Sequence, residues 1–173
     1  MLATPSLPLA PIASPRVYSA GELCRAMLAC PERPLRLDVS GLDRVLCHDA
    51  ERGLLEVQAA TPWRALAGFA GECFGPGTVG ESVAANSPGP DGRPVVAHLR
   101  SLTMVTADGE LRRISREQTP ELFALAVGGF GALGPFYSVT LELDSLARAA
   151  AGAVTAVRMA LPQDDAPGPR FAI

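Results

Sequence analysis

The fold is decided by the stretch Ser101–Leu143, which reads SLTMVTADGELRRISREQTPELFALAVGGFGALGPFYSVTLEL. Two strands are predicted around its start, over Leu99–Val105 and Glu110–Ser115. Between them, Asp108-Gly109 is a dipeptide that is typical of a tight hairpin turn. The start of this stretch therefore predicts a β-hairpin.

A helix and a third strand follow in the same stretch. The motif Thr119-Pro120-Glu121 places a proline in a first helical turn, and Gly128-Gly129 ends the helix that is predicted over Leu122–Val127. Phe136–Leu143 is rich in β-branched and aromatic residues and alternates, which is typical of a strand.

One helix is predicted near the N-terminus. Ser19 fits an N-cap, and Leu23, Met27 and Leu28 recur at helical spacing before Pro31 ends the segment. The next segment, residues 34–46, is predicted to be a half-buried strand followed by a turn, because apolar and polar residues alternate in its first half.

A second hairpin is predicted between Arg44–Cys47 and Leu54–Ala59. Thr61-Pro62 then supplies an N-cap and a first-turn proline for a helix through Ala70. Its aromatic residues Trp63 and Phe69 fall on one face, and both are expected in the core.

The middle and the two ends of the chain are expected to be less regular. Residues 71–94 are rich in glycine and proline, and one short helix is predicted at their centre, at ESVAAN. Residues 1–15 carry four prolines and no charge, which predicts a flexible leader outside the fold. After Asp144, an alanine-rich segment fits either a helix or one more strand.

Composition excludes several classes of function. All 15 basic residues are arginines, so Schiff-base chemistry and a Walker A phosphate loop, which both need lysine, are excluded. The net charge is −3 and the arginines are scattered, so neither a nucleic acid nor an anionic membrane surface is expected as a partner. No apolar run approaches the ~20 residues of a membrane helix.

Cysteine and histidine give no sign of a metal site. The four cysteines lack a C-x-x-C spacing, so they are expected to be small buried side chains in a reducing cytoplasm. His48 and His98 are both expected to be ordinary, partly exposed residues. No metal ligand is assigned.

Three motifs in order resemble the FAD-binding domain of the vanillyl-alcohol oxidase and p-cresol methylhydroxylase (PCMH-type) flavoprotein superfamily. They are GLDRVLCHDAERGLLEVQAATPWRAL at residues 41–66, GTVGESVAANSPG at residues 77–89, and the stretch that opens this section. The resemblance covers roughly residues 16–144, a shortened domain, and leaves 145–173 as a partly disordered extension. Within the superfamily it is most similar to the oxidases of sugars and sugar alcohols.

The resemblance implies an α+β fold of two lobes with FAD between them. The small N-terminal lobe is reduced here, and the larger lobe has a mainly antiparallel sheet flanked by helices. Relatives hold FAD through backbone amides of glycine-rich loops, which approach the cofactor closely because glycine has no side chain. Carried over by position, the cofactor-binding residues are Gly77, Thr78, Val79, Gly80, Ser82, Asn86, Gly89 and Phe136. No catalytic residue is assigned.

The chain departs from the family pattern at three places. Residues 34–39 run straight through where relatives carry a glycine-rich pyrophosphate loop, which also carries a histidine that is often attached to flavin. Glu81 stands where the family reads the last glycine of T-V-G-G. Pro135, which has no N–H to donate, stands where relatives often contact FAD through the backbone.

Two hypotheses about function stay open. The first is the FAD-binding domain of an oxidoreductase of sugars or alcohols, whose missing substrate domain is supplied by a partner subunit. The second is a non-enzymatic remnant without cofactor that acts as an interaction module or partner subunit.

Overall fold

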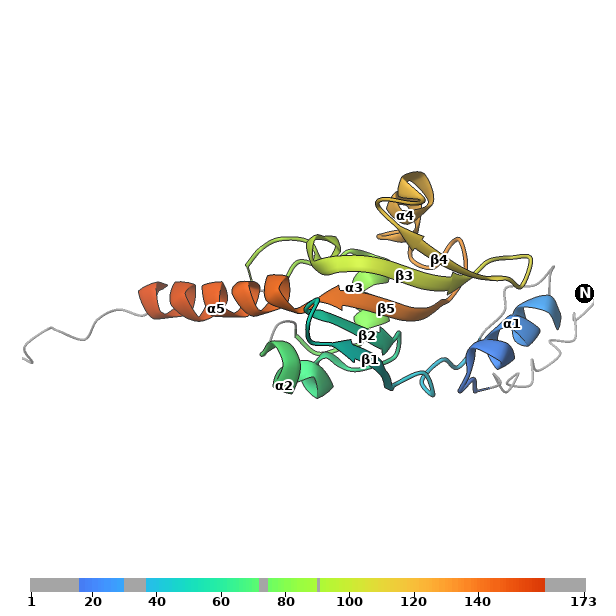
Figure 1. The fold of residues 1–173 in the computed structure, drawn as a ribbon, viewed down its shortest axis with the longest axis horizontal. Coiled ribbons are helices and arrows are strands. Elements are labelled where there is room, and N and C mark those ends of the chain that lie inside the picture. Colours follow the sequence, from blue (N-terminus) through green and yellow to red (C-terminus); the bar gives the residue numbers. More distant parts are fainter. Residues whose placement is uncertain (1–15, 30–36, 72–74, 90, 161–173) are drawn as a thin grey trace, which may run out of the picture.

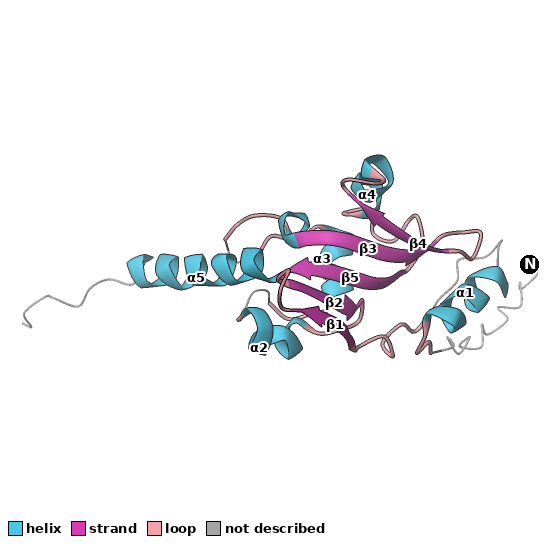
Figure 2. Cartoon of the chain, viewed as in Figure 1, coloured by secondary structure: helices cyan, strands magenta, loops and turns pink. Residues whose placement is uncertain are grey.

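The computed structural model describes residues 16–29, 37–71, 75–89 and 91–160. Five strands form one sheet at the centre of the molecule (Figures 1 and 2): β1 (Val45–Asp49), β2 (Leu54–Gln58), β3 (Leu99–Val105), β4 (Leu111–Ser115) and β5 (Phe136–Glu142). Their order is β1-β2-β5-β3-β4, and every pair is antiparallel. The last of the described strands, β5, thus fills the centre of the sheet, between the two hairpins.

Helices lie around this sheet and at its ends. They are α1 (Ala20–Ala29), α2 (Ala67–Ala70), α3 (Val79–Ala85), α4 (Pro120–Ala126) and α5 (Leu143–Ala160), with 3-10 helices at Trp63–Leu66 and Val95–His98. Figure 1 shows α1 at one end of the molecule and α5 projecting from the opposite end, with α3 behind the sheet. Among the described helices, none is both long and apolar enough to cross a membrane.

The main core includes the apolar positions of β2, β3 and β5. Leu55 and Val57 of β2 and Val139 and Leu141 of β5 are fully buried, and they belong to one cluster with Val83 of α3. The positions between them are polar and hydrogen-bonded across the strands. The sheet therefore has one apolar face and one polar face, as the alternation of its strands requires.

A polar network covers the other face of the sheet. Ser138 Oγ donates to Glu56 Oε1 at 2.7 Å, and Ser101 Oγ donates to Thr140 Oγ1 at 3.0 Å. Arg113 Nε donates to the Ser101 hydroxyl at 3.1 Å. These bonds satisfy the polar groups of Ser101, Ser138 and Thr140, which are almost fully buried.

A second, smaller cluster fixes the N-terminal part beside the sheet. Val17, Leu23 of α1, Leu42 and Val105 of β3 are buried together, and other apolar side chains, among them Leu37 and Val39, pack against them. The N-terminal segment therefore lies against one end of β3 and does not extend the sheet.

Most of the predicted elements are confirmed. Both hairpins, the helices after Ser19 and Thr119, the short helix at ESVAAN and the strand at Phe136 are present. The segment after Asp144, which fitted either a helix or a strand, is helical in α5. The five-stranded antiparallel sheet with its helices confirms the predicted α+β fold.

Two predicted elements differ from the structure. The part of the predicted strand 34–46 that precedes the turn and is described, Leu37–Val39, forms no strand, because its only bridge is Arg16 to Asp38. The helix predicted after Thr61 is divided into a 3-10 helix and α2, and its N-cap residue is Pro62. Thr61 itself is buried, and its hydroxyl reaches the carbonyl of Arg44 at 3.5 Å.

Three expectations about single side chains were wrong. Phe69 is 40% exposed, and its ring meets the His48 ring edge-on, with 5.2 Å between the ring centroids. Trp63 is in the core as predicted. His98 is fully buried, because the 3-10 helix before β3 places its ring against α5, with Nδ1 2.8 Å from Ser145 Oγ. Cys47 is exposed, because β1 is an edge strand whose side chains are largely uncovered.

Candidate functional site

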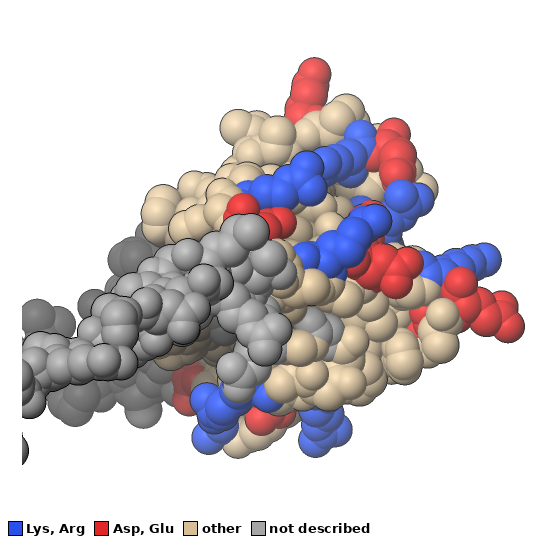
Figure 3. Space-filling model, turned by 90° about the vertical axis from the view of Figure 1, so that its left-hand side faces the viewer, with Lys and Arg blue, Asp and Glu red and all other residues tan. Residues whose placement is uncertain are grey.

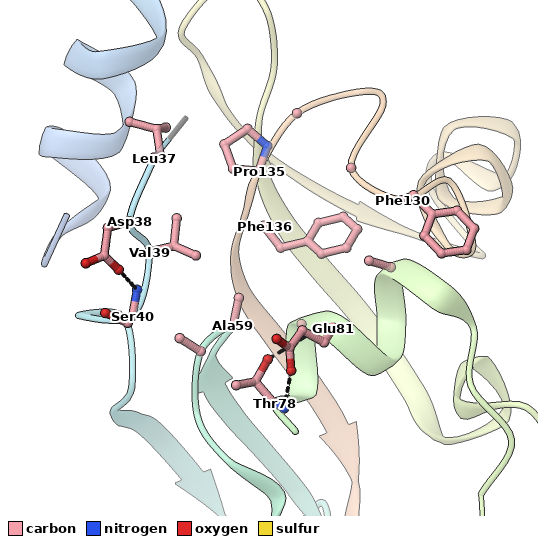
Figure 4. Close-up of a pocket in the computed structure, with 15 residues that line it drawn as sticks. Leu37, Asp38, Val39, Ser40, Ala59, Thr78, Glu81, Phe130, Pro135 and Phe136 are labelled. Carbon is pink, nitrogen blue, oxygen red and sulfur yellow. Dashed lines mark hydrogen bonds between the residues drawn. The ribbon is translucent and has the colours of Figure 1, made fainter. Parts of the chain in front are cut away.

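An open cavity of about 420 Å³ separates the N-terminal segment from the sheet. Leu37–Ser40 forms one wall, and the residues after β2, α3 and the segment before β5 form the other (Figure 4). Most of the wall is apolar, from residues such as Val39, Ala84, Phe130 and Phe136. The cavity lies between the N-terminal segment and the sheet, and the resemblance leads us to expect the cofactor in such a cleft.

Two glycines shape the cavity by letting backbones approach. Gly80 of α3 lies against Ala59, where a Cβ on Gly80 would be 2.8 Å from the Ala59 carbonyl oxygen. Gly134 has φ of +135°, and a Cβ there would collide with the carbonyl oxygen of Val105. Both positions therefore require glycine for steric reasons that are independent of any ligand.

Thr78 and Glu81 close a capping box at the start of α3. Glu81 N–H donates to Thr78 Oγ1 at 3.2 Å, and Thr78 N–H donates to Glu81 Oε2 at 2.8 Å. Such reciprocal bonds satisfy amides that a helix leaves open at its first turn. The Glu81 carboxylate thereby lies at the edge of the cavity, next to Thr78 (Figure 4).

The neighbouring backbone amides are engaged as well. Val79 N–H donates to Thr61 O at 3.0 Å, Gly80 N–H to Ala59 O at 2.7 Å, and Ser82 N–H to Thr78 O at 3.1 Å. Each N–H from Thr78 to Ser82 thus has an acceptor within the chain. A phosphate that binds here must displace one of these acceptors.

The structure brings three of the predicted cofactor-binding residues to the cavity. Thr78, Gly80 and Phe136 line it. Two of the positions that depart from the family pattern, Glu81 and Pro135, line it too. The departures therefore lie at the cavity itself.

Five predicted residues do not line this cavity: Gly77, Val79, Ser82, Asn86 and Gly89. Val79 is in the core, and Ser82 Oγ accepts the indole N–H of Trp63 at 2.9 Å. Asn86 ends α3 in the left-handed conformation, with φ of +47°. Gly77 O accepts Trp63 N–H at 3.2 Å, and Gly89 N–H donates to Arg93 O at 2.7 Å.

Several lining residues were missed in the sequence. Val39, Ala59, Ala84 and Phe130 are ordinary apolar residues whose types carry no functional signal. Phe130 alone offers a clue, because an aromatic residue between Gly129 and Gly131 is unusual in a turn. Its φ is +49° and 79% of its surface is exposed.

Asp38 contributes to the wall, but its carboxylate is turned away from the cavity (Figure 4). Its Oδ1 accepts Ser40 N–H at 3.0 Å, and its Oδ2 lies 3.9 Å from Arg16 Nε. Hydrogen bonds from Ser40, with a smaller contribution from Arg16, hold the pKa of Asp38 below its ordinary value. Asp38 therefore orders the Leu37–Ser40 wall.

A second cavity, of about 350 Å³, lies where β5 passes into α5. Its lining includes Arg52, Arg100 and Arg148 together with Glu142 and Asp144. In the space-filling view of the end from which α5 projects, basic and acidic side chains intermingle (Figure 3). The mixed signs single out no class of charged ligand.

Comparisons with known proteins identify the family of the chain. The model of a family described as FAD binding domain matches residues 17–115, more than half of the chain. None of the curated protein sequences matches this chain.

Two solved structures of alkyldihydroxyacetonephosphate synthase, from different crystal forms, share the fold. One has a TM-score of 0.59 at 15% identity and covers 73% of this chain, and the other has 0.51 at 17% identity and covers 61%. The chain spans only 31% and 22% of the length of those proteins. The match of the family model and this fold confirm the resemblance found in the sequence, and the chain belongs to the family of PCMH-type FAD-binding domains.

Proposed function

We propose that this chain is the flavin-holding part of an oxidoreductase and that the isoalloxazine ring of FAD lies in the 420 Å³ cavity. The observation that carries the proposal is the open, mostly apolar cleft between Leu37–Ser40 and α3, in a chain of an FAD-binding family. A flat, largely apolar ring is more stable against such apolar walls than it is in water.

The residues that would hold the ring are Phe130, Phe136, Val39 and Ala84. Two phenyl rings and two aliphatic side chains can cover a flat aromatic system on its faces and edges. A flavin, when bound, accepts a hydride or electrons from a substrate. The role of this chain would be to orient the ring and to exclude water from it.

The described wall supplies no pair of groups for acid and base chemistry on a substrate. Of its two carboxylates, Asp38 faces away and Glu81 is bonded to Thr78. We therefore propose that a further domain or a partner subunit binds the substrate, which by the resemblance is a sugar or another alcohol. The thiols of Cys24 and Cys47 are free, which supports our proposal that the protein is located in the reducing cytoplasm.

A second candidate is an interaction module that has lost its cofactor. The engaged amides from Thr78 to Ser82 favour it, because they offer no free donor to a phosphate. The two candidates differ in whether the cavity holds any flavin at all.

Purification and titration of the full chain would separate them. The flavin-holding domain retains or takes up flavin, seen as visible flavin absorbance that stays with the protein through dialysis. The interaction module takes up none, either during purification or when FAD or riboflavin is added in excess.

A further inference from the structure

The charge that faces the cavity is negative. Glu81 is at its edge, while the carboxylate of Asp38 is turned toward Ser40 and Arg16. Among the described lining residues, none is Arg, Lys or His. The described wall therefore offers no cation to an anionic ligand.

The Glu81 carboxylate also holds the place that a phosphate oxygen would take. Its Oε2 is 2.8 Å from Thr78 N, and a Cβ on Gly77 would be 3.1 Å from the same oxygen. A phosphate oxygen that accepts the Thr78 N–H must move this carboxylate oxygen away. If the carboxylate moves only slightly, two anions are in contact and repel each other.

We infer that Glu81 is a specificity-determining residue that makes the cavity a site for the uncharged ring of a flavin and a poor site for its phosphates. The inference rests on the proposed function, because it assumes that the ring lies in this cavity. Riboflavin, which carries the ring and the ribityl chain without phosphate, is then the preferred ligand of the isolated chain. FMN and FAD bind more weakly in proportion to the charge they bring near Glu81.

The size of the preference follows from the position of Glu81. Its side chain is exposed, so water and salt screen the repulsion. A difference of about tenfold between riboflavin and FAD, about 1.4 kcal/mol, is expected at low ionic strength. Added salt reduces this difference in affinity, whereas a preference that arises from the shape of the ligand alone would not depend on salt.

Equilibrium dialysis of the full chain against riboflavin, FMN and FAD tests the inference. Glu81→Gln removes the charge and keeps an acceptor for Thr78 N–H, so the fold is retained and the preference for riboflavin shrinks. Glu81→Gly removes the charge and also frees that N–H, so FMN and FAD gain affinity while riboflavin does not.

Glu121→Gln is the matched control. Glu121 is an exposed acidic residue in the first turn of α4, and it does not line the cavity. This substitution should leave the ratio of riboflavin to FAD affinity unchanged. Circular dichroism of each variant would verify that the helices are intact.

The outcomes separate the inference from the proposed function. FAD that binds the unmodified chain as tightly as riboflavin, or a ratio that Glu81→Gln does not change, overturns the inference and leaves the flavin site standing. If none of the three flavins binds, both are overturned. Riboflavin preferred in the unmodified chain, with the preference lost in Glu81→Gln, supports both.

Discussion

Gly80 donates its backbone N–H to the carbonyl oxygen of Ala59 over 2.7 Å, and this bond ties the start of α3 to the residue that follows β2. Both residues line the cavity. The shape of the proposed flavin site therefore depends on a backbone contact that leaves no space for a side chain.

Gly80→Ala should destabilise the protein and distort the cavity. The new Cβ would lie 2.8 Å from Ala59 O and 2.9 Å from Ala59 Cβ, so α3 must shift. A cost of about 1–3 kcal/mol is expected in chemical denaturation. Gly68→Ala in α2 is the control, because no atom lies within 4 Å of a Cβ there. Equal stability of the two variants would contradict the role of this contact.

Gly134→Ala should cost more than Gly92→Ala. Both glycines have positive φ, +135° and +75°, so both substitutions carry backbone strain. Only Gly134 also faces an obstacle, the carbonyl oxygen of Val105, whereas the space around Gly92 is open. Thermal unfolding of the two variants measures the difference, about 1–3 kcal/mol. A Gly134→Ala protein as stable as Gly92→Ala would show that the segment before β5 is not fixed in this way.

Phe130→Ala should weaken flavin binding without destabilising the fold. The ring is 79% exposed at the cavity rim, so its removal creates no hole in the core. Loss of one aromatic contact to the ligand is expected to cost about 1 kcal/mol, roughly fivefold in Kd. Leu125→Ala is the matched control, 64% exposed on α4 and outside the cavity wall. Riboflavin titration of both variants checks this, and equal affinities would place the ring elsewhere.

Stability should fall in mild acid because of His98. Burial lowers its pKa below the ordinary 6.5, and Arg93 acts in the same direction, against the opposing effects of Asp91 and Glu142. The unfolded chain then binds more protons than the folded chain, so the contribution of His98 to stability is present above pH ~6.5 and is lost as the pH falls toward the lowered pKa.

Thermal unfolding between neutral pH and pH ~5 measures this loss. His98→Gln should flatten the pH dependence, because it removes the buried imidazole. A steeper loss in the His98 variant than in the unmodified chain would contradict this assignment.

The sequence predicted the sheet well because its strands carry local signals. Asp108-Gly109 marked one hairpin, and the alternation of Phe136–Leu143 matches a central strand with one apolar face. The same kind of alternation predicted a strand at Leu37–Val39, and that prediction was wrong. Those apolar side chains do face a cluster, but within the described part of the chain the segment forms a single isolated bridge, from Asp38 to Arg16, and no ladder.

The candidate site was predicted only in part, because its position depends on contacts between distant segments. The family motifs led to Thr78 and Gly80, while Val39 lies outside all three motifs and Phe130 lies within the third without having been singled out. The capping box of Thr78 and Glu81 can be read from the residue types T-x-x-E. Its position at the cavity edge required the fold.

The most direct test of the flavin site is to fill the cavity with a larger side chain from its own wall. Ala84 lines it from α3, and Ala85, its neighbour on the same helix, is exposed and does not. Riboflavin binding would be measured by equilibrium dialysis for Ala84→Phe and for Ala85→Phe. We predict that Ala84→Phe abolishes binding while Ala85→Phe leaves it unchanged. Riboflavin bound equally well by both variants would contradict it.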